Sequence, residues 1–167
     1  NDFMFVNHYA TELATSEVSS YFVETYTEKY GESSVVAVIN PDKKDFTIGI
    51  RADMDALLIE EKTELPFKSQ IKGQMHACGH DSHTAILLTV AKILKDWEGA
   101  LPCNVRLLFQ PSEEGAISGA KMMADNGCLE GVDAVICLHC EEALDSGTLG
   151  VQIGPCMAAC IPLCMKF

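Results

Sequence analysis

Short apolar runs alternate along this chain with longer stretches of helical periodicity, and this alternation restricts the fold more than any other feature of the sequence. The runs cover residues 34–39, 46–50, 104–109 and 131–138, and they have the length and the branched side chains of buried strands. Strands that alternate with helices favour a largely parallel sheet with helices on both faces. The sequence therefore predicts an α/β fold with three layers, α/β/α.

Helical patterns fill the stretches between these runs. They cover residues 11–30, 81–95 and 118–126. Asp81 or Ser82 stands where it could cap the start of the second helix, and Gly127 stands where the third helix would end. The first two apolar runs, 34–39 and 46–50, are separated only by a turn-like segment, so we expect them to pair with each other.

Composition supports one ordinary domain and excludes several classes of function. Of the 167 residues, 48% are hydrophobic, which is enough for a real core. The chain has 12 Lys and Arg against 24 Asp and Glu, with no basic cluster, so we expect no nucleic-acid partner. Its apolar runs are too short to cross a bilayer, so we expect no membrane span. The eight cysteines lie mostly within apolar runs, which favours free, buried thiols in the reducing cytoplasm over a disulfide framework.

Side chains that can bind metals or transfer protons follow the predicted strands and precede the long helix. They are Asp53, Asp55, Cys78, His80, Glu113, Glu114 and His139. Because ligands of open α/β sheets bind at the carboxyl ends of the strands, we expect these side chains to converge on one edge of the sheet. Thiolate, imidazole and carboxylate together suit Zn, Mn or Co better than Mg or Ca, which prefer oxygen ligands. The sequence therefore predicts a site for a divalent metal of the first group.

Two other catalytic sites would use some of the same residues. His76 and His80 have the spacing of the helical zinc-protease pair, but no Glu lies between them, so that motif is rejected. Cys78 with an imidazole could form a nucleophilic cysteine protease. That alternative is less favoured because it leaves the adjacent acids Glu113 and Glu114 without a role.

Six short motifs, taken together and in this order, resemble the M20 metallopeptidase family. They lie at residues 50–56, 65–67, 75–83, 109–115, 138–139 and 154–159. The branch they resemble is that of the N-acyl amino acid amidohydrolases, which includes hippurate hydrolases and auxin-conjugate hydrolases. This resemblance implies a zinc-exopeptidase-like catalytic domain that is incomplete in this chain. Residues 1–156 would be its first part, and residues 157–167 would begin the connection to a lid or dimerisation domain, through which the full-length form would be a homodimer.

The resemblance also implies roles for individual residues. By position, the family's ligands to two divalent ions (Zn, Mn or Co) fall on Cys78, His80, Glu114 and His139. Glu113 matches the general base that takes a proton from water. Asp53 keeps only the position of an orienting acid.

The implied reaction is hydrolysis of the amide bond of small N-acyl amino acids, with Glu113 as the general base. A catalytically silent metal-binding fragment is the alternative, because a further ligand and the lid are expected outside this chain. The sequence leaves open whether His76, Asp81 and His83 touch the metal ligands or serve only the fold.

Overall fold

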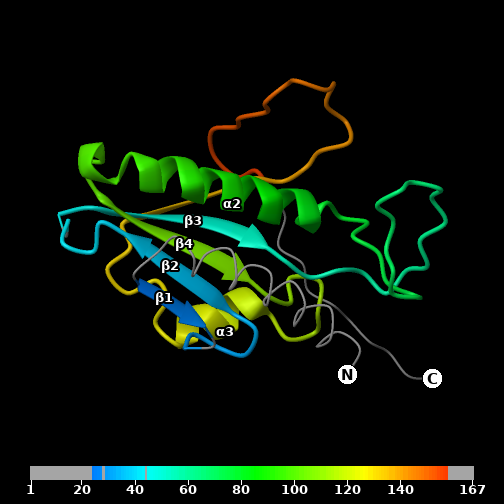
Figure 1. Ribbon diagram of the computed structural model, residues 1–167, viewed down its shortest axis with the longest axis horizontal. Coiled ribbons are helices and arrows are strands. Elements are labelled where there is room, and N and C mark those ends of the chain that lie inside the picture. The colour runs from blue at the N-terminus through cyan, green and yellow to red at the C-terminus, as the bar shows by residue number, and fades with distance from the viewer. Residues whose placement is uncertain (1–23, 28, 44, 158–167) are drawn as a thin grey trace.

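A computed structural model describes residues 24–27, 29–43 and 45–157 as an α/β domain (Figure 1). The described residues form a five-stranded sheet in the order β1-β2-β4-β3-β5. Its strands are β1 (Glu24–Thr27), β2 (Val35–Ile39), β3 (Thr47–Asp53), β4 (Asn104–Gln110) and β5 (Ala134–Cys137). The helices are α2 (His80–Asp96), the 3-10 helix η1 (Glu98–Ala100) and α3 (Gly119–Asp125). The predicted α/β class is therefore confirmed.

The sheet is mixed, and its parallel part consists of β3, β4 and β5, the strands whose carboxyl ends precede candidate site residues. β3 runs parallel to both β4 and β5, whereas β2 runs antiparallel to β1 and β4. The crossover from β3 to β4 runs through α2, as a parallel pair requires. Because β4 lies between β2 and β3, the predicted pairing of 34–39 with 46–50 is wrong. A short turn suggested a hairpin, but the long-range parallel pairing takes precedence.

The two helices cover opposite faces of the sheet, as Figure 1 shows. Alternate residues of each strand point to opposite faces. One face of β2 and β4 packs with Leu87 and Ala91 of α2, and the other packs with Met123 of α3. Leu107 and Val36, which are fully buried, lie in these two different clusters. The three-layer arrangement thus follows from the two-residue period of the strands.

The helix boundaries agree with the prediction except at two points. Residues 24–27 form a strand paired with β2, so the helix predicted for 11–30 is wrong there, and its earlier part lies outside the described residues. α2 begins after Gly79, whose φ of 89° is left-handed and which makes no side-chain cap, so neither Asp81 nor Ser82 caps it. At α3 the prediction is confirmed: the N–H of Gly127, which has a φ of 87°, bonds to Ala124 O.

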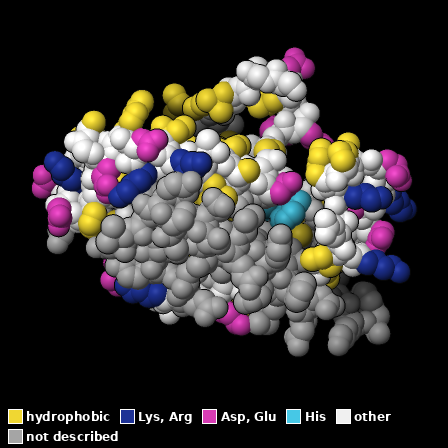
Figure 2. All heavy atoms as spheres, viewed as in Figure 1, with side chains coloured by type: hydrophobic (Ala, Val, Ile, Leu, Met, Phe, Trp, Pro, Cys, Tyr) yellow, Lys and Arg dark blue, Asp and Glu magenta, His cyan; other side chains and the backbone are white. Residues whose placement is uncertain are grey.

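Apolar side chains are exposed on β5 and on two long segments. β5 is one of the two edge strands of the sheet, and all four of its residues are exposed. Figure 2 shows hydrophobic side chains on the segment that follows β5, at the top, and on the excursion of residues 57–75, at the right. They include Leu144, Leu149, Val151, Ile153, Leu58, Ile59, Leu65 and Phe67.

The structure also bears on two further expectations, that the cysteines are free and buried and that no helix spans a membrane. The cysteines at 78, 103, 128, 137, 140 and 156 are free, as predicted. Of these, Cys128 is buried, whereas Cys137 is exposed because it lies on the exposed edge strand β5. The prediction that most cysteines are buried is therefore wrong for the described part of the chain. Within that part, no helix has both the length and the apolar character needed to cross a membrane.

Candidate metal centre

The carboxyl ends of β3, β4 and β5 and the start of α2 meet at one edge of the sheet. In the parallel register Asp53 is opposite Gln110, and Arg51 is opposite Cys137, so the three strands end close together. The backbone N–H of Met54 bonds to Gln110 O at 2.9 Å, which keeps the chain beside β4 after β3 ends. The predicted convergence of the residues after these strands is thereby explained by the register.

Asp55 links the two segments that carry predicted ligands. Its Oδ2 accepts the backbone N–H of Glu114 at 2.9 Å, and its Oδ1 lies 3.1 Å from Nδ1 of His80. Burial alone would raise the pKa of Asp55, but hydrogen bonds from His80 and from the N–H groups of Glu114 and Glu113 bring that pKa below its ordinary value. Asp55 is thus a buried carboxylate that fixes His80 relative to Glu114. The sequence predicts Asp55 at this edge of the sheet but does not indicate this linking role.

The geometry around His80 leaves one ring nitrogen available to a metal. Both neighbours of Nδ1 are oxygens of Asp55, the backbone O at 2.9 Å and Oδ1, so Nδ1 carries the hydrogen and donates. Nε2 is buried and has no hydrogen-bond partner among the described residues. It lies 3.9 Å from Glu114 Oε1 and 4.0 Å from Glu113 Oε2. A buried imidazole nitrogen with no partner, oriented by a carboxylate on its other nitrogen, is the arrangement typical of a metal ligand.

Cys78, His80 and Glu114 form a group whose potential ligand atoms all lie within 4.8 Å of one another. His139 lies outside that group of three, but its Nε2 is 3.5 Å from Cys78 Sγ. Burial, followed by the hydrogen bond and charge of Glu114, raises the pKa of Cys78 to about 11. An acidic environment that disfavours the bare thiolate fits a divalent cation, which binds the thiolate and offsets the carboxylates. The structure thus brings together the four residues predicted as ligands. Cys78 is close both to His139 and to the pair of His80 and Glu114.

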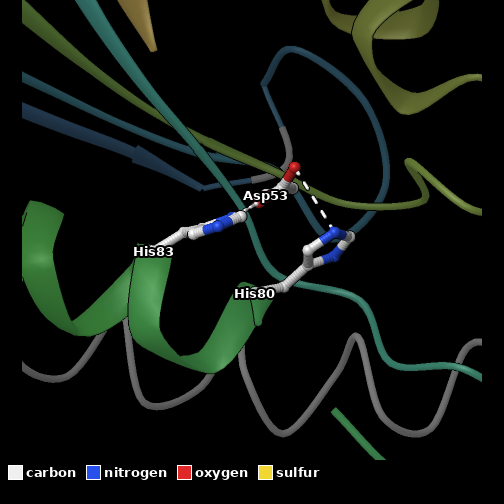
Figure 3. A group of neighbouring side chains, drawn as sticks. All are labelled: Asp53, His80 and His83. Atoms are coloured by element: carbon white, nitrogen blue, oxygen red, sulfur yellow. Dashed lines mark hydrogen bonds and ion pairs between the residues drawn. The ribbon is translucent and has the colours of Figure 1, made fainter. Parts of the chain in front are cut away.

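A second group, Asp53, His80 and His83, also has ligand atoms within 4.8 Å of one another (Figure 3). Its atoms already have protein partners. Oδ1 of Asp53 accepts Nδ1–H of His83 at 2.6 Å, and Oδ2 lies 2.8 Å from NH1 of Arg51. Nε2 of His83 accepts the backbone N–H of Cys140 at 2.9 Å. This second group is therefore a hydrogen-bonded network. His80 Nε2 lies 3.6 Å from Asp53 Oδ2 and is the nitrogen of the group that has no hydrogen-bond partner among the described residues.

The adjacent acids Glu113 and Glu114 differ in exposure. The side chain of Glu113 is 44% exposed and that of Glu114 is 24% exposed. The loop that carries them is tight, because Ser112 has a φ of 51° and a Cβ on Gly119 would lie 1.6 Å from Pro111 O. Glu114 joins the ligand group, and Glu113 faces the same nitrogen of His80 from the solvent side.

The remaining residues of the His-rich motif have separate surroundings. Burial lowers the pKa of His76, whose Nδ1 has no hydrogen-bond partner among the described residues, and His76 lies in neither candidate group. Asp81 is exposed in the first turn of α2. The sequence left the role of His83 open; the available signal was that His80 and His83 are three residues apart and therefore share one face of the helix.

Comparison with known proteins agrees with this geometry. The sequence model of peptidase family M20/M25/M40 matches residues 49–160, which include every residue of both groups. An N-acetyl-L-cysteine deacetylase of Bacillus subtilis is 49% identical over 128 residues, 77% of this chain and 30% of that protein. The IAA-amino acid hydrolase ILR1-like 4 of Arabidopsis thaliana is 41% identical over 160 residues, 90% of this chain and 36% of that protein. The chain thus spans about a third of the length of these relatives.

A solved structure extends the agreement to the fold. The YXEP protein of Bacillus subtilis, described as a dinuclear metal binding peptidase from the M20 family, superposes with a TM-score of 0.81. It is 39% identical, and the match covers 87% of this chain and 40% of that one. The part of the chain that holds the candidate metal centre therefore has the fold of a metal-binding relative.

Proposed function

The chain belongs to peptidase family M20/M25/M40, and from this membership we propose that the protein is a metal-dependent amidohydrolase that cleaves the amide bond of N-acyl amino acids. The observation that carries the proposal is the unpartnered Nε2 of His80 within reach of Cys78 and Glu114. The names of two relatives, a deacetylase of N-acetyl-L-cysteine and a hydrolase of IAA-amino acids, support this substrate class. In both, an acyl group is joined to an amino acid.

We propose that Cys78, His80, Glu114 and His139 hold two divalent ions, with Zn, Mn or Co as the candidates. The thiol of Cys78 contacts His139 and is grouped with His80 and Glu114, which supports the proposal that these four side chains would hold the ions together. When bound, such ions polarise the scissile carbonyl and lower the pKa of water.

Glu113 is the proposed general base. Its carboxylate is more exposed than that of Glu114, outside the ligand group, and 4.0 Å from the nitrogen of His80 that faces the ligands. A carboxylate in that place can accept a proton from the attacking water and return it to the departing amine. Asp53 is proposed to orient its neighbours, because both of its oxygens lie against protein donors, Arg51 and His83.

The test measures metal content and turnover in the complete polypeptide that carries these residues. We expect stoichiometric metal, and we expect hydrolysis of N-acetyl and aromatic N-acyl amino acids that stops on chelation and returns with Zn, Mn or Co. Turnover that survives complete removal of metal would refute the proposal. Bound metal without turnover on any N-acyl amino acid would instead support the silent metal-binding alternative.

A further inference from the structure

We propose that His83 is a positioning residue, which holds the segment after β5 against the start of α2 so that the imidazole of His139 faces Cys78. The inference rests on the proposed metal centre, and it assigns to His83 a task different from ligation. His83 is 1% exposed and lies on α2, one helical turn from His80. Figure 3 shows both imidazoles projecting from this helix toward Asp53 at the end of β3.

The hydrogen bonds of His83 use both of its ring nitrogens. Asp53 Oδ1, an acceptor, lies 2.6 Å from Nδ1, so Nδ1 carries the hydrogen. The N–H of Cys140, a donor, lies 2.9 Å from Nε2, so Nε2 must accept. His83 is therefore held as the neutral tautomer with its hydrogen on Nδ1, and it has no free lone pair for a metal. Its accepting nitrogen anchors the residue that directly follows His139.

The acid that orients His83 is itself held firmly. Asp53 Oδ2 lies 2.8 Å from Arg51 NH1, and Arg51 Nε donates to the side chain of Gln110 at 2.7 Å. The backbone O of Asp53 accepts the hydroxyl of Thr84 at 3.0 Å. These bonds connect the ends of β3 and β4 with α2, so the position of His83 is set by three elements of the core.

Ring packing places His83 between the two proposed imidazole ligands. Its ring centroid lies 5.4 Å from that of His80 and 5.1 Å from that of His139. Close packing holds the same segment from a second side, because a Cβ on Gly79 would lie 3.1 Å from Cys140 Cβ. The start of α2 and residue 140 are therefore in tight contact.

Among the described residues, few hydrogen bonds join the segment after β5 to the rest of the protein. β5 is exposed on all four residues, and residue 139 is exposed as well. The other hydrogen bonds seen in residues 141–157 join near neighbours within that segment, such as Leu144 N to Glu141 O and Thr148 N to Asp145 O. The bond from Cys140 to His83 therefore anchors this segment to the core. A ligand that is held in place before the ion arrives loses less freedom on binding, so the anchor favours metal affinity.

The experiment uses Co²⁺ as the metal probe on the complete polypeptide. The thiolate-to-cobalt absorption band reports binding by Cys78, and the weaker d–d bands report the number and arrangement of the ligands. We expect His83→Ala to keep the thiolate band, to change the d–d bands as His139→Ala does, and to weaken Co²⁺ binding by roughly 10- to 100-fold. The double variant His83→Ala/His139→Ala should bind no more weakly than His139→Ala, because the two changes act on one ligand.

Two further variants separate positioning from a general effect on folding. His83→Gln should recover most of the affinity, since one amide offers a donor to Asp53 and an acceptor to Cys140. Thr84→Val removes a buried bond of the same helix to the backbone O of Asp53 but none to residue 140, so it should lower the melting temperature and change the Co²⁺ spectrum far less than His83→Ala does. If His83→Ala does not fold, His83→Phe replaces it, because it fills the space without accepting from Cys140.

Wild-type Co²⁺ affinity and spectrum in a folded His83→Ala or His83→Phe variant would overturn the inference, as would full additivity with His139→Ala. A wild-type protein that fails to bind Co²⁺ would overturn the proposed metal centre itself, and this inference with it. The two failures are therefore distinguishable.

Discussion

Asp55→Asn tests whether a buried carboxylate organises the metal centre. The carboxylate of Asp55 accepts hydrogen bonds from the N–H of Glu114 at 2.9 Å and from Nδ1 of His80 at 3.1 Å. An asparagine keeps one oxygen acceptor and turns an N–H₂ group toward the other donor. Hydrogen bonds to charged groups contribute about 1.5–3 kcal/mol each, so the net loss is on the order of 3 kcal/mol in the metal-free protein.

The pH dependence of this loss follows from two pKa shifts of opposite sign. The pKa of Asp55 is lowered in the folded state, so its contribution is present above the unfolded value of about 3.9 and is lost as the pH falls through the folded value. Burial alone would lower the pKa of His80, but the hydrogen bond to Asp55 and the charge of Asp53 raise it. The contribution of His80 is therefore present below about 6.5 and is lost as the pH rises through its folded value. The destabilisation should be largest between these two limits.

The assay is urea unfolding of the chelator-treated protein, followed by circular dichroism at pH 3, 5 and 9. The matched control is Asp81→Asn, which removes an exposed carboxylate from the first turn of the same helix and should cost roughly 0.3–1 kcal/mol. A loss for Asp55→Asn that is as small as the control, or that is constant across these pH values, would contradict the reasoning. In the metal-loaded protein the same change should weaken metal binding by roughly 10- to 100-fold, measured by competition with a chelating dye.

Three further changes have outcomes that follow from the same geometry. Glu113→Gln should leave the metal content unchanged and reduce kcat by roughly 10²- to 10⁴-fold, and metal analysis beside steady-state kinetics checks it; loss of the metal would place Glu113 among the ligands instead. Gly119→Ala puts a Cβ 1.6 Å from Pro111 O and should cost about 3 kcal/mol or more, whereas Gly99→Ala, where nothing lies within 4 Å, should be nearly neutral; equal melting temperatures would refute the clash. Because the pKa of Cys78 is raised to about 11, binding of Zn²⁺ as thiolate should release its proton at pH 7, which calorimetry in buffers of different ionisation enthalpy detects as a buffer-dependent heat; a heat independent of the buffer would argue against a thiolate ligand.

Local patterns predicted the elements that depend on neighbouring residues. β4, α2 and α3 lie close to their expected positions, since apolar spacing and the cap at Gly127 are read within one turn or one strand. The side chains predicted as ligands do lie at strand ends or at the start of the long helix, because this placement depends only on where each element begins or ends. That they bind a metal stays a prediction. Nothing in those patterns depends on distant parts of the chain.

Strand order and the supporting network could not be predicted in this way. β2 pairs with β4, whose sequence lies beyond α2, so the turn between 34–39 and 46–50 carried a false signal. The bond from His83 to Cys140 joins residues 57 positions apart, and no local rule relates them. Arg51 and Asp53 are two residues apart on one face of β3, and this was the available sign that they form a pair.

Because the centre is acidic, a metal ion and protons would compete for the same two side chains, the thiol of Cys78 and the imidazole of His80. Burial and the nearby acids raise the pKa of Cys78, and for His80 the hydrogen bond to Asp55 and the charge of Asp53 raise the pKa against the effect of burial. Among the described residues, the fixed cation in direct contact with these acids is Arg51, at 2.8 Å from Asp53. Without a metal, the same acids favour the protonated forms of the thiol and the imidazole. A divalent ion satisfies the field with more charge and displaces those protons, so metal loading should strengthen as the pH rises. The carboxylates that disfavour a bare thiolate are therefore the feature that would favour a cation at this edge of the sheet.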